Sequence, residues 1–128
     1  MGFVELIKLR KETILSEWAR DLKEAGVGAE LDQPALIDHM PELLSKLASC
    51  LEHETPREQR DLGETAATHA VERLWRDVDL RAVVREYQLL RQVVLRVSER
   101  EGALEPEPDA VARFHSAIDA AIAEAAQE

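Results

Sequence analysis

The chain has 128 residues, of which 45% are hydrophobic and 33% charged, and its net charge is −10. This length suits one domain with a single core, and the apolar fraction is too high for a disordered chain. The negative charge argues against nucleic-acid binding, because affinity for phosphates depends on Lys and Arg. The sequence contains no signal peptide and no apolar run near the ~20 residues of a membrane span. Together with a single cysteine, Cys50, these features predict a cytoplasmic protein without membrane insertion.

The composition predicts an all-α fold. Ala, Leu, Glu and Arg are abundant, aromatic residues make up 4%, and Gly and Pro number five each. Such a mixture favours helices and leaves little material for strands. The spacing of the apolar residues predicts a compact bundle of about five helices with short connections, which together form one domain over residues 1–128.

Two helices are expected in the first half of the chain. The first covers about residues 3–25 and ends at a pair of nearby glycines. The second covers about residues 34–52. Because Pro41 disfavours a helical conformation at Met40, we expect a kink or a restart near His39.

The third helix has a strong start signal at Thr55. This residue can cap the helix, with Pro56 at the first helical position and Glu58 completing a capping box. The helix is expected to continue to about residue 76. Its clearest apolar stripe consists of Ala67, Val71, Leu74, Trp75 and Val78.

The last two helices are expected at residues 80–101, with Asp79 as N-cap, and at residues 109–128. The apolar residues of the last helix are spaced alternately by three and four, which is a heptad pattern. No stop signal follows, so we expect residues 109–128 to lead into an output domain as a coiled-coil-like segment, or to pair with a second copy. The residues expected at this dimer or output seam are Val111, Phe114, His115, Ile118 and Ile122.

Two charged residues of the fourth helix fall among its apolar residues at 100° per residue. Arg91 falls inside the apolar arc, between Leu80 and Tyr87, and Glu86 falls on the far shoulder. Each can belong to a structural ion pair that ties helices together. Alternatively, Arg91 and Tyr87 line a small pocket or a dimer seam, where a guanidinium binds an anion or a partner carboxylate. If Arg91 pairs in the core, Arg91→Met should cost several kcal/mol of stability.

His69 and Arg73 lie one turn apart on the third helix, opposite its clear apolar stripe. This position predicts a solvent-exposed pair. Against that interpretation, the same side of the helix also carries Leu62, Ala66 and Ala70, which are apolar enough to be covered by another element.

No cofactor, metal or catalytic group is expected. No second His or Cys stands at ligand spacing from His69 on its helix. His39 and His115 border apolar stripes, and either could be the proximal ligand of a haem, although a lone His in such a place is more often a hydrogen-bonded core residue. The sequence contains no Gly-rich loop and no nucleophile motif, so we do not expect an enzyme.

Four blocks of the sequence resemble, in the same order, the N-terminal domain of RsbRD-type stress regulators, a module that also precedes many bacterial sensor histidine kinases. The blocks are LIDHMPELL at 36–44, HAVERL at 69–74, DLRAVVREYQLLR at 79–91 and FHSAIDAAIAEA at 114–125. The third block is the most specific. The positions that match the motifs, and are therefore candidates for a sensory or interface core, are His39, His69, Arg73, Glu86, Tyr87 and Arg91.

The resemblance implies a non-catalytic helical sensory module, often likened to a globin without haem, whose last helix leads into an output domain such as a kinase. Our leading hypothesis is the homodimeric input domain of a bacterial two-component histidine kinase, which relays a signal through its C-terminal helix. The alternatives are an interaction scaffold in a stress-signalling complex and a haem-binding or small-ligand-binding globin-like domain.

Overall fold

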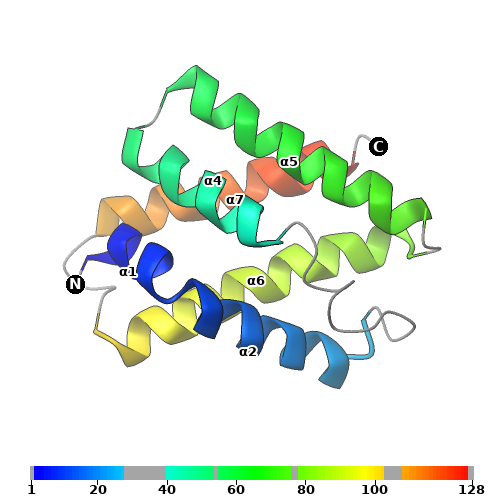
Figure 1. The fold of residues 1–128 in the computed structure, drawn as a ribbon, viewed down its shortest axis with the longest axis horizontal. Helices are drawn as coiled ribbons and strands as arrows, with labels where there is room; N and C mark the ends of the chain where they lie inside the picture. Colours follow the sequence, from blue (N-terminus) through cyan, green and yellow to red (C-terminus); the bar gives the residue numbers. More distant parts are fainter. Residues whose placement is uncertain (1, 28–39, 54, 76–77, 103–107, 127–128) are drawn as a thin grey trace.

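The computed structural model describes residues 2–27, 40–53, 55–75, 78–102 and 108–126. In these ranges the chain forms six helices and no strand, so the predicted all-α fold is confirmed. The helices, labelled as in Figure 1, are α1 (Phe3–Leu9), α2 (Lys11–Glu24), α4 (Met40–His53), α5 (Pro56–Trp75), α6 (Leu80–Arg100) and α7 (Pro108–Ala126).

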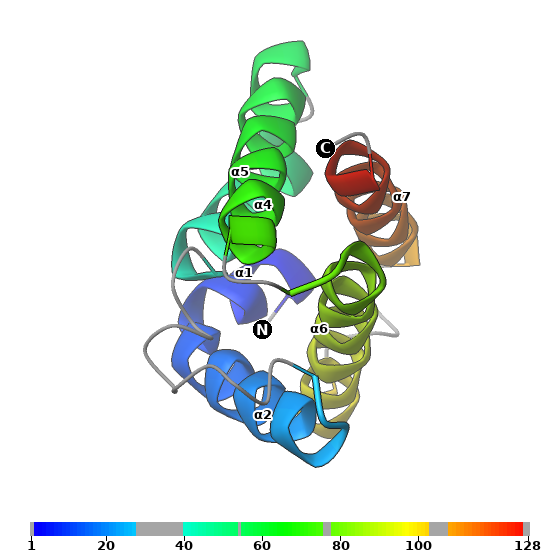
Figure 2. The ribbon, with the colours of Figure 1, turned by 90° about the vertical axis from the view of Figure 1, so that its right-hand side faces the viewer.

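The helices surround one core. Helix α6 packs against α2 on one side and α7 on the other, and α5 packs against α4 and α7. Viewed end on, α2, α6, α7 and α5 therefore follow one another around the bundle (Figure 2). Helices α1 and α4 contact each other and close the remaining side. None of the helices described here combines the length and hydropathy that crossing a membrane requires.

The single first helix predicted over residues 3–25 is wrong, because the backbone leaves the helical region at Arg10 (φ −109°, ψ 24°). The break lets the two halves bury different faces. Helix α1 packs mainly on α4, and the ring of its Phe3 lies edge-on to Phe114 of α7 with centroids 5.3 Å apart. Helix α2 instead packs along α6.

Both predicted N-caps form. The amide of Ala82 donates to Oδ1 of Asp79 at 2.8 Å, and the amide of Glu58 donates to Oγ1 of Thr55 at 3.2 Å. The Glu58 carboxylate accepts a hydrogen bond from Ser49 at 2.8 Å, so it joins α5 to α4. The predicted start of the second helix and His39 lie outside the described residues.

The buried face of α5 differs from the predicted one. Leu62, Ala66 and Ala70 are buried, and His69 and Arg73 on the same side are buried with them. The predicted solvent exposure of these two residues is therefore wrong. Ala67 and Val71, from the predicted stripe, are only half-buried; the side chains of Leu74 and Trp75 lie outside the described part of the chain.

Helix α7 uses its apolar pattern inside this chain. Phe114 and Ile118, which were expected at a dimer or output seam, lie in the core. Val111, His115 and Ile122 are half-buried along the edge of the same stripe. The heptad spacing therefore reflects packing against α4, α5 and α6.

Candidate functional site

The centre of the bundle holds four polar or aromatic side chains from two helices, which we call the Glu86 cluster. Helix α5 contributes His69 and Arg73, and α6 contributes Glu86 and Tyr87. The side chains of His69, Arg73 and Glu86 are each at most 2% exposed, and Tyr87 is fully buried. Charged residues are almost never buried so completely unless they are paired.

Arg73 and His69 share one carboxylate. Nε of Arg73 lies 3.0 and 3.2 Å from Oε1 and Oε2 of Glu86, and a terminal nitrogen of the same guanidinium lies 3.0 Å from Oε1. Nε2 of His69 lies 3.2 Å from Oε1. Because an ionised carboxylate only accepts hydrogen bonds, we assign the donating proton of His69 to Nε2. The charge of Glu86 is thus neutralised and hydrogen-bonded within the core.

Tyr87 and Trp18 connect the cluster to the backbone. The hydroxyl of Tyr87 donates to the carbonyl oxygen of Ala66 at 3.3 Å, and its ring lies edge-on to His69 with centroids 5.8 Å apart. Nε1 of Trp18, on α2, donates to the backbone oxygen of Glu86 at 2.9 Å. Burial raises the pKa of Tyr87, the Glu86 charge raises it further, and Arg73 opposes both. Three helices therefore meet at Glu86.

Arg91 does not join this cluster. Its side chain is 26% exposed and forms an ion pair with Asp119, which is 66% exposed, at the surface between α6 and α7. The predicted burial of Arg91 is wrong because the buried arc of α6 is turned toward Glu86. A shallow surface cavity includes Arg91 and Asp119 but not Tyr87, so the two residues do not line a common pocket.

A family comparison covers this whole arrangement. The model of the family described as "RsbT co-antagonist protein rsbRD N-terminal domain" matches residues 12–128. The chain belongs to this family. The match begins within α2 and includes every member of the Glu86 cluster. No curated protein and no solved structure matches the chain.

Membership makes this RsbRD N-terminal domain a regulatory domain of stress-signalling proteins. Four cavities lie among the described residues, and none of these four is lined by members of the Glu86 cluster. The described part of the chain also holds no group of three His, Cys, Asp or Glu residues that could bind a metal. His115 is half-buried on α7 and lines none of those cavities, and His39 lies outside the described residues.

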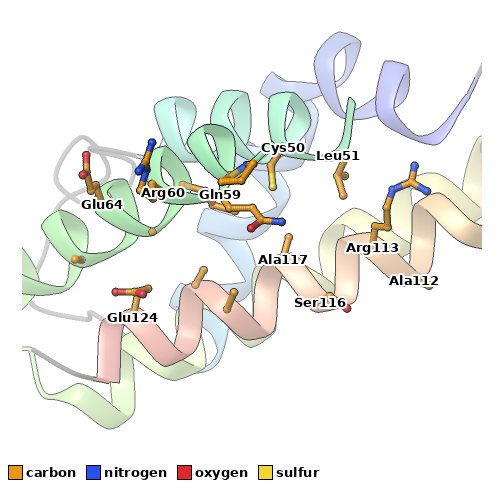
Figure 3. Close-up of a pocket in the computed structure, with 16 residues that line it drawn as sticks. Cys50, Leu51, Gln59, Arg60, Glu64, Ala112, Arg113, Ser116, Ala117 and Glu124 are labelled. Carbon is orange, nitrogen blue, oxygen red and sulfur yellow. The ribbon is translucent and has the colours of Figure 1, made fainter. Parts of the chain in front are cut away.

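The RsbRD domain also carries a groove between α5 and α7, closed at one end by the last turn of α4 (Figure 3). Its volume is about 940 Å³. Gly63 and Ala67 of α5 face a row of small residues on α7, and the charged lining residues are Arg60, Glu64, Arg113 and Glu124. The heptad pattern of α7 does not reveal this groove. The available signal was the four-residue spacing of Ala112, Ser116 and Ala120, outside the heptad stripe.

Proposed function

We propose that this domain is the non-catalytic, cytoplasmic input of a bacterial signal-transduction protein, and that it acts as a homodimer which relays a signal through α7 to an output domain such as a histidine kinase. The family description supports a regulatory role, because it names its members as co-antagonists of another protein, RsbT. Regulation of this kind works through protein contacts and not through turnover of a substrate.

The main support for the proposed relay is the Glu86 cluster. A buried ion pair contributes little net stability compared with apolar side chains of similar volume. It does, however, penalise arrangements in which its charges separate, so it favours a small number of discrete packings. Helices α5 and α6, which supply the cluster, both pack on α7. A change in how α5 sits on α6 would therefore reach α7 directly.

The test of the relay uses the full-length protein and measures its output, for example autophosphorylation of a fused kinase, with and without stress. His69→Gln and Tyr87→Phe each alter one hydrogen bond and keep the Arg73–Glu86 pair. Both should shift the ratio of basal to stimulated output. The matched control is Gln88→Ala, on the exposed side of α6. If the cluster variants keep the wild-type ratio while folding normally, the relay proposal is wrong.

The homodimer has its own test. Size-exclusion chromatography with light scattering should give twice the chain mass at micromolar concentrations. A monomer throughout the accessible concentration range contradicts the dimeric part of the proposal and leaves the relay to be judged by its own assay.

A scaffold function is the second candidate, and the α5–α7 groove favours it. An open groove lined by small side chains suits a helix of another protein. In that case a partner is retained without any small molecule, and variants of the Glu86 cluster leave output unchanged as long as the groove is intact.

A further inference from the structure

The α5–α7 groove has a shape that can accommodate a helix. On α7, the outward residues Ala112, Ser116 and Ala120 recur every four positions, and Ala117 lies beside them. On α5, a methyl group on Gly63 would come within 3.3 Å of Cγ of Glu124, so the two walls are already close. Rows of small side chains at this spacing let a third helix approach the first two closely.

The charges along the groove are arranged by sign. Arg113 lies toward one end, near the last turn of α4, and Glu64 and Glu124 lie toward the other end (Figure 3). Arg60 stands one turn before Glu64 on α5, a spacing at which opposite charges attract each other. Arg113 and Glu124 are 11 positions apart, which is about three helical turns or ~16 Å, so both project from the same side of α7.

We propose that the occupant of this groove is α7 of a second copy, running antiparallel about a two-fold axis near Ala117 and Ala120. In this arrangement Arg113 faces Glu124 of the partner subunit, and the symmetric contact repeats at the other end. The small residues between them lie against their counterparts. This inference rests on the proposed homodimer and specifies its surface.

The charge order selects this geometry over others. A parallel pairing of the same helices would place Glu124 beside Glu124 of the partner subunit, and like charges in contact weaken association. A head-to-tail contact would not close into a dimer. The antiparallel two-fold pairing is the one in which both ends carry opposite charges and the same patch serves both copies.

Charge reversal tests the contact in sedimentation equilibrium at low salt. Arg113→Glu and Glu124→Arg should each weaken the dimer at least tenfold. The variant with both substitutions should recover, and so should an equimolar mixture of the two single variants, because both contacts in the mixed dimer then join opposite charges. Arg81→Glu and Glu99→Arg are the matched controls, since they change net charge equally at exposed sites on α6.

A substitution that changes size and not charge provides a second test, in case a charge variant does not fold. Ala120→Trp adds bulk at an exposed position of the groove and should give a folded monomer by circular dichroism and light scattering. If the protein is a dimer that none of these variants weakens, the interface lies elsewhere and this inference is overturned while the proposed function stands. If the wild-type protein is a monomer at every concentration, this inference and the proposed dimer both fail.

Discussion

Nε of Arg73 lies within 3.2 Å of both carboxylate oxygens of Glu86, and the two side chains, from different helices, are each 2% exposed. Such a pair is asymmetric in its energetics. Desolvating both charges offsets most of their attraction, whereas removing one partner leaves the other charge buried without the counter-charge of this pair. Replacing one of the two residues should therefore destabilise the fold strongly, whereas replacing both together should destabilise it only weakly.

Glu86→Leu or Arg73→Met alone should lower the free energy of unfolding by about 3–5 kcal/mol, because each leaves a charge in the core. The double variant should lose less than the larger of the two single losses. Chemical denaturation of the four proteins measures the cycle. Additive losses would mean that the two side chains do not compensate each other in the folded state.

Arg91→Met should cost less than about 1 kcal/mol, since its pair with Asp119 is partly solvated and exposed ion pairs contribute little. Asp119→Ala is the matched substitution on the other side of the pair and should have an equally small effect. The same denaturation assay applies. A loss of several kcal/mol for Arg91→Met would return Arg91 to the core, as the sequence pattern suggested.

Tyr87 should resist ionisation in the folded protein. It is the only tyrosine of the chain, so phenolate absorbance reports on this residue alone. Burial, followed by the charge of Glu86, raises its pKa above the ordinary value of 10.0. A raised folded pKa contributes stability that is complete below the unfolded pKa and is lost as pH rises above it. Phenolate should therefore appear only with alkaline unfolding, whereas protein in urea should titrate near 10.0; a folded-state titration at that pH would contradict the burial of the hydroxyl.

Glu17 should make stability depend on acid pH. Its carboxylate, 13% exposed, lies 2.6 Å from Arg100 and 3.0 Å from Arg96. The hydrogen bond from Arg100, opposed by burial and assisted by Arg96, lowers its pKa below 4.5. A lowered folded pKa contributes stability that is present above the unfolded value and lost as pH falls through the folded value.

Wild-type protein should therefore be more stable than Glu17→Gln at neutral pH, and the difference should shrink as pH falls below 4.5. Denaturation at a series of pH values measures that difference, which added salt should also reduce because the network is at the surface. Glu12→Gln, exposed on the same helix, is the matched control. A difference that stays constant with pH would show that Glu17 carries no stabilising charge.

The local features of the fold could be predicted because their causes are local. Asp79 caps α6 and Thr55 caps α5 through bonds to amides three residues away. The helix break at Arg10 has a distant counterpart, since α1 packs mainly on α4 and α2 mainly on α6. No signal within a few residues of Arg10 contains that information.

The candidate site was only partly predictable for the same reason. Helix α5 has two partly apolar faces, and apolar content alone favours the face of Ala67 and Val71 as the buried one. The other face is buried because α6 supplies Glu86 opposite His69 and Arg73. The polarity of His69 and Arg73 predicts that they are exposed, and only their pairing with Glu86 in space explains why they are buried. Arg91, on the same helix as Glu86, was misplaced because the true buried arc is rotated away from it.

Glu86 also sets the axial register of three helices. Its backbone oxygen holds Trp18 of α2 at 2.9 Å, while its carboxylate holds Arg73 of α5 at 3.0 Å. Sliding either helix along α6 by one residue moves it about 1.5 Å, which carries these bonds beyond useful length. Small axial displacements are therefore resisted up to a threshold and then release several hydrogen bonds together. In a domain built in this way, α2 and α5 have defined positions along α6, and an applied force moves them abruptly from one position to another.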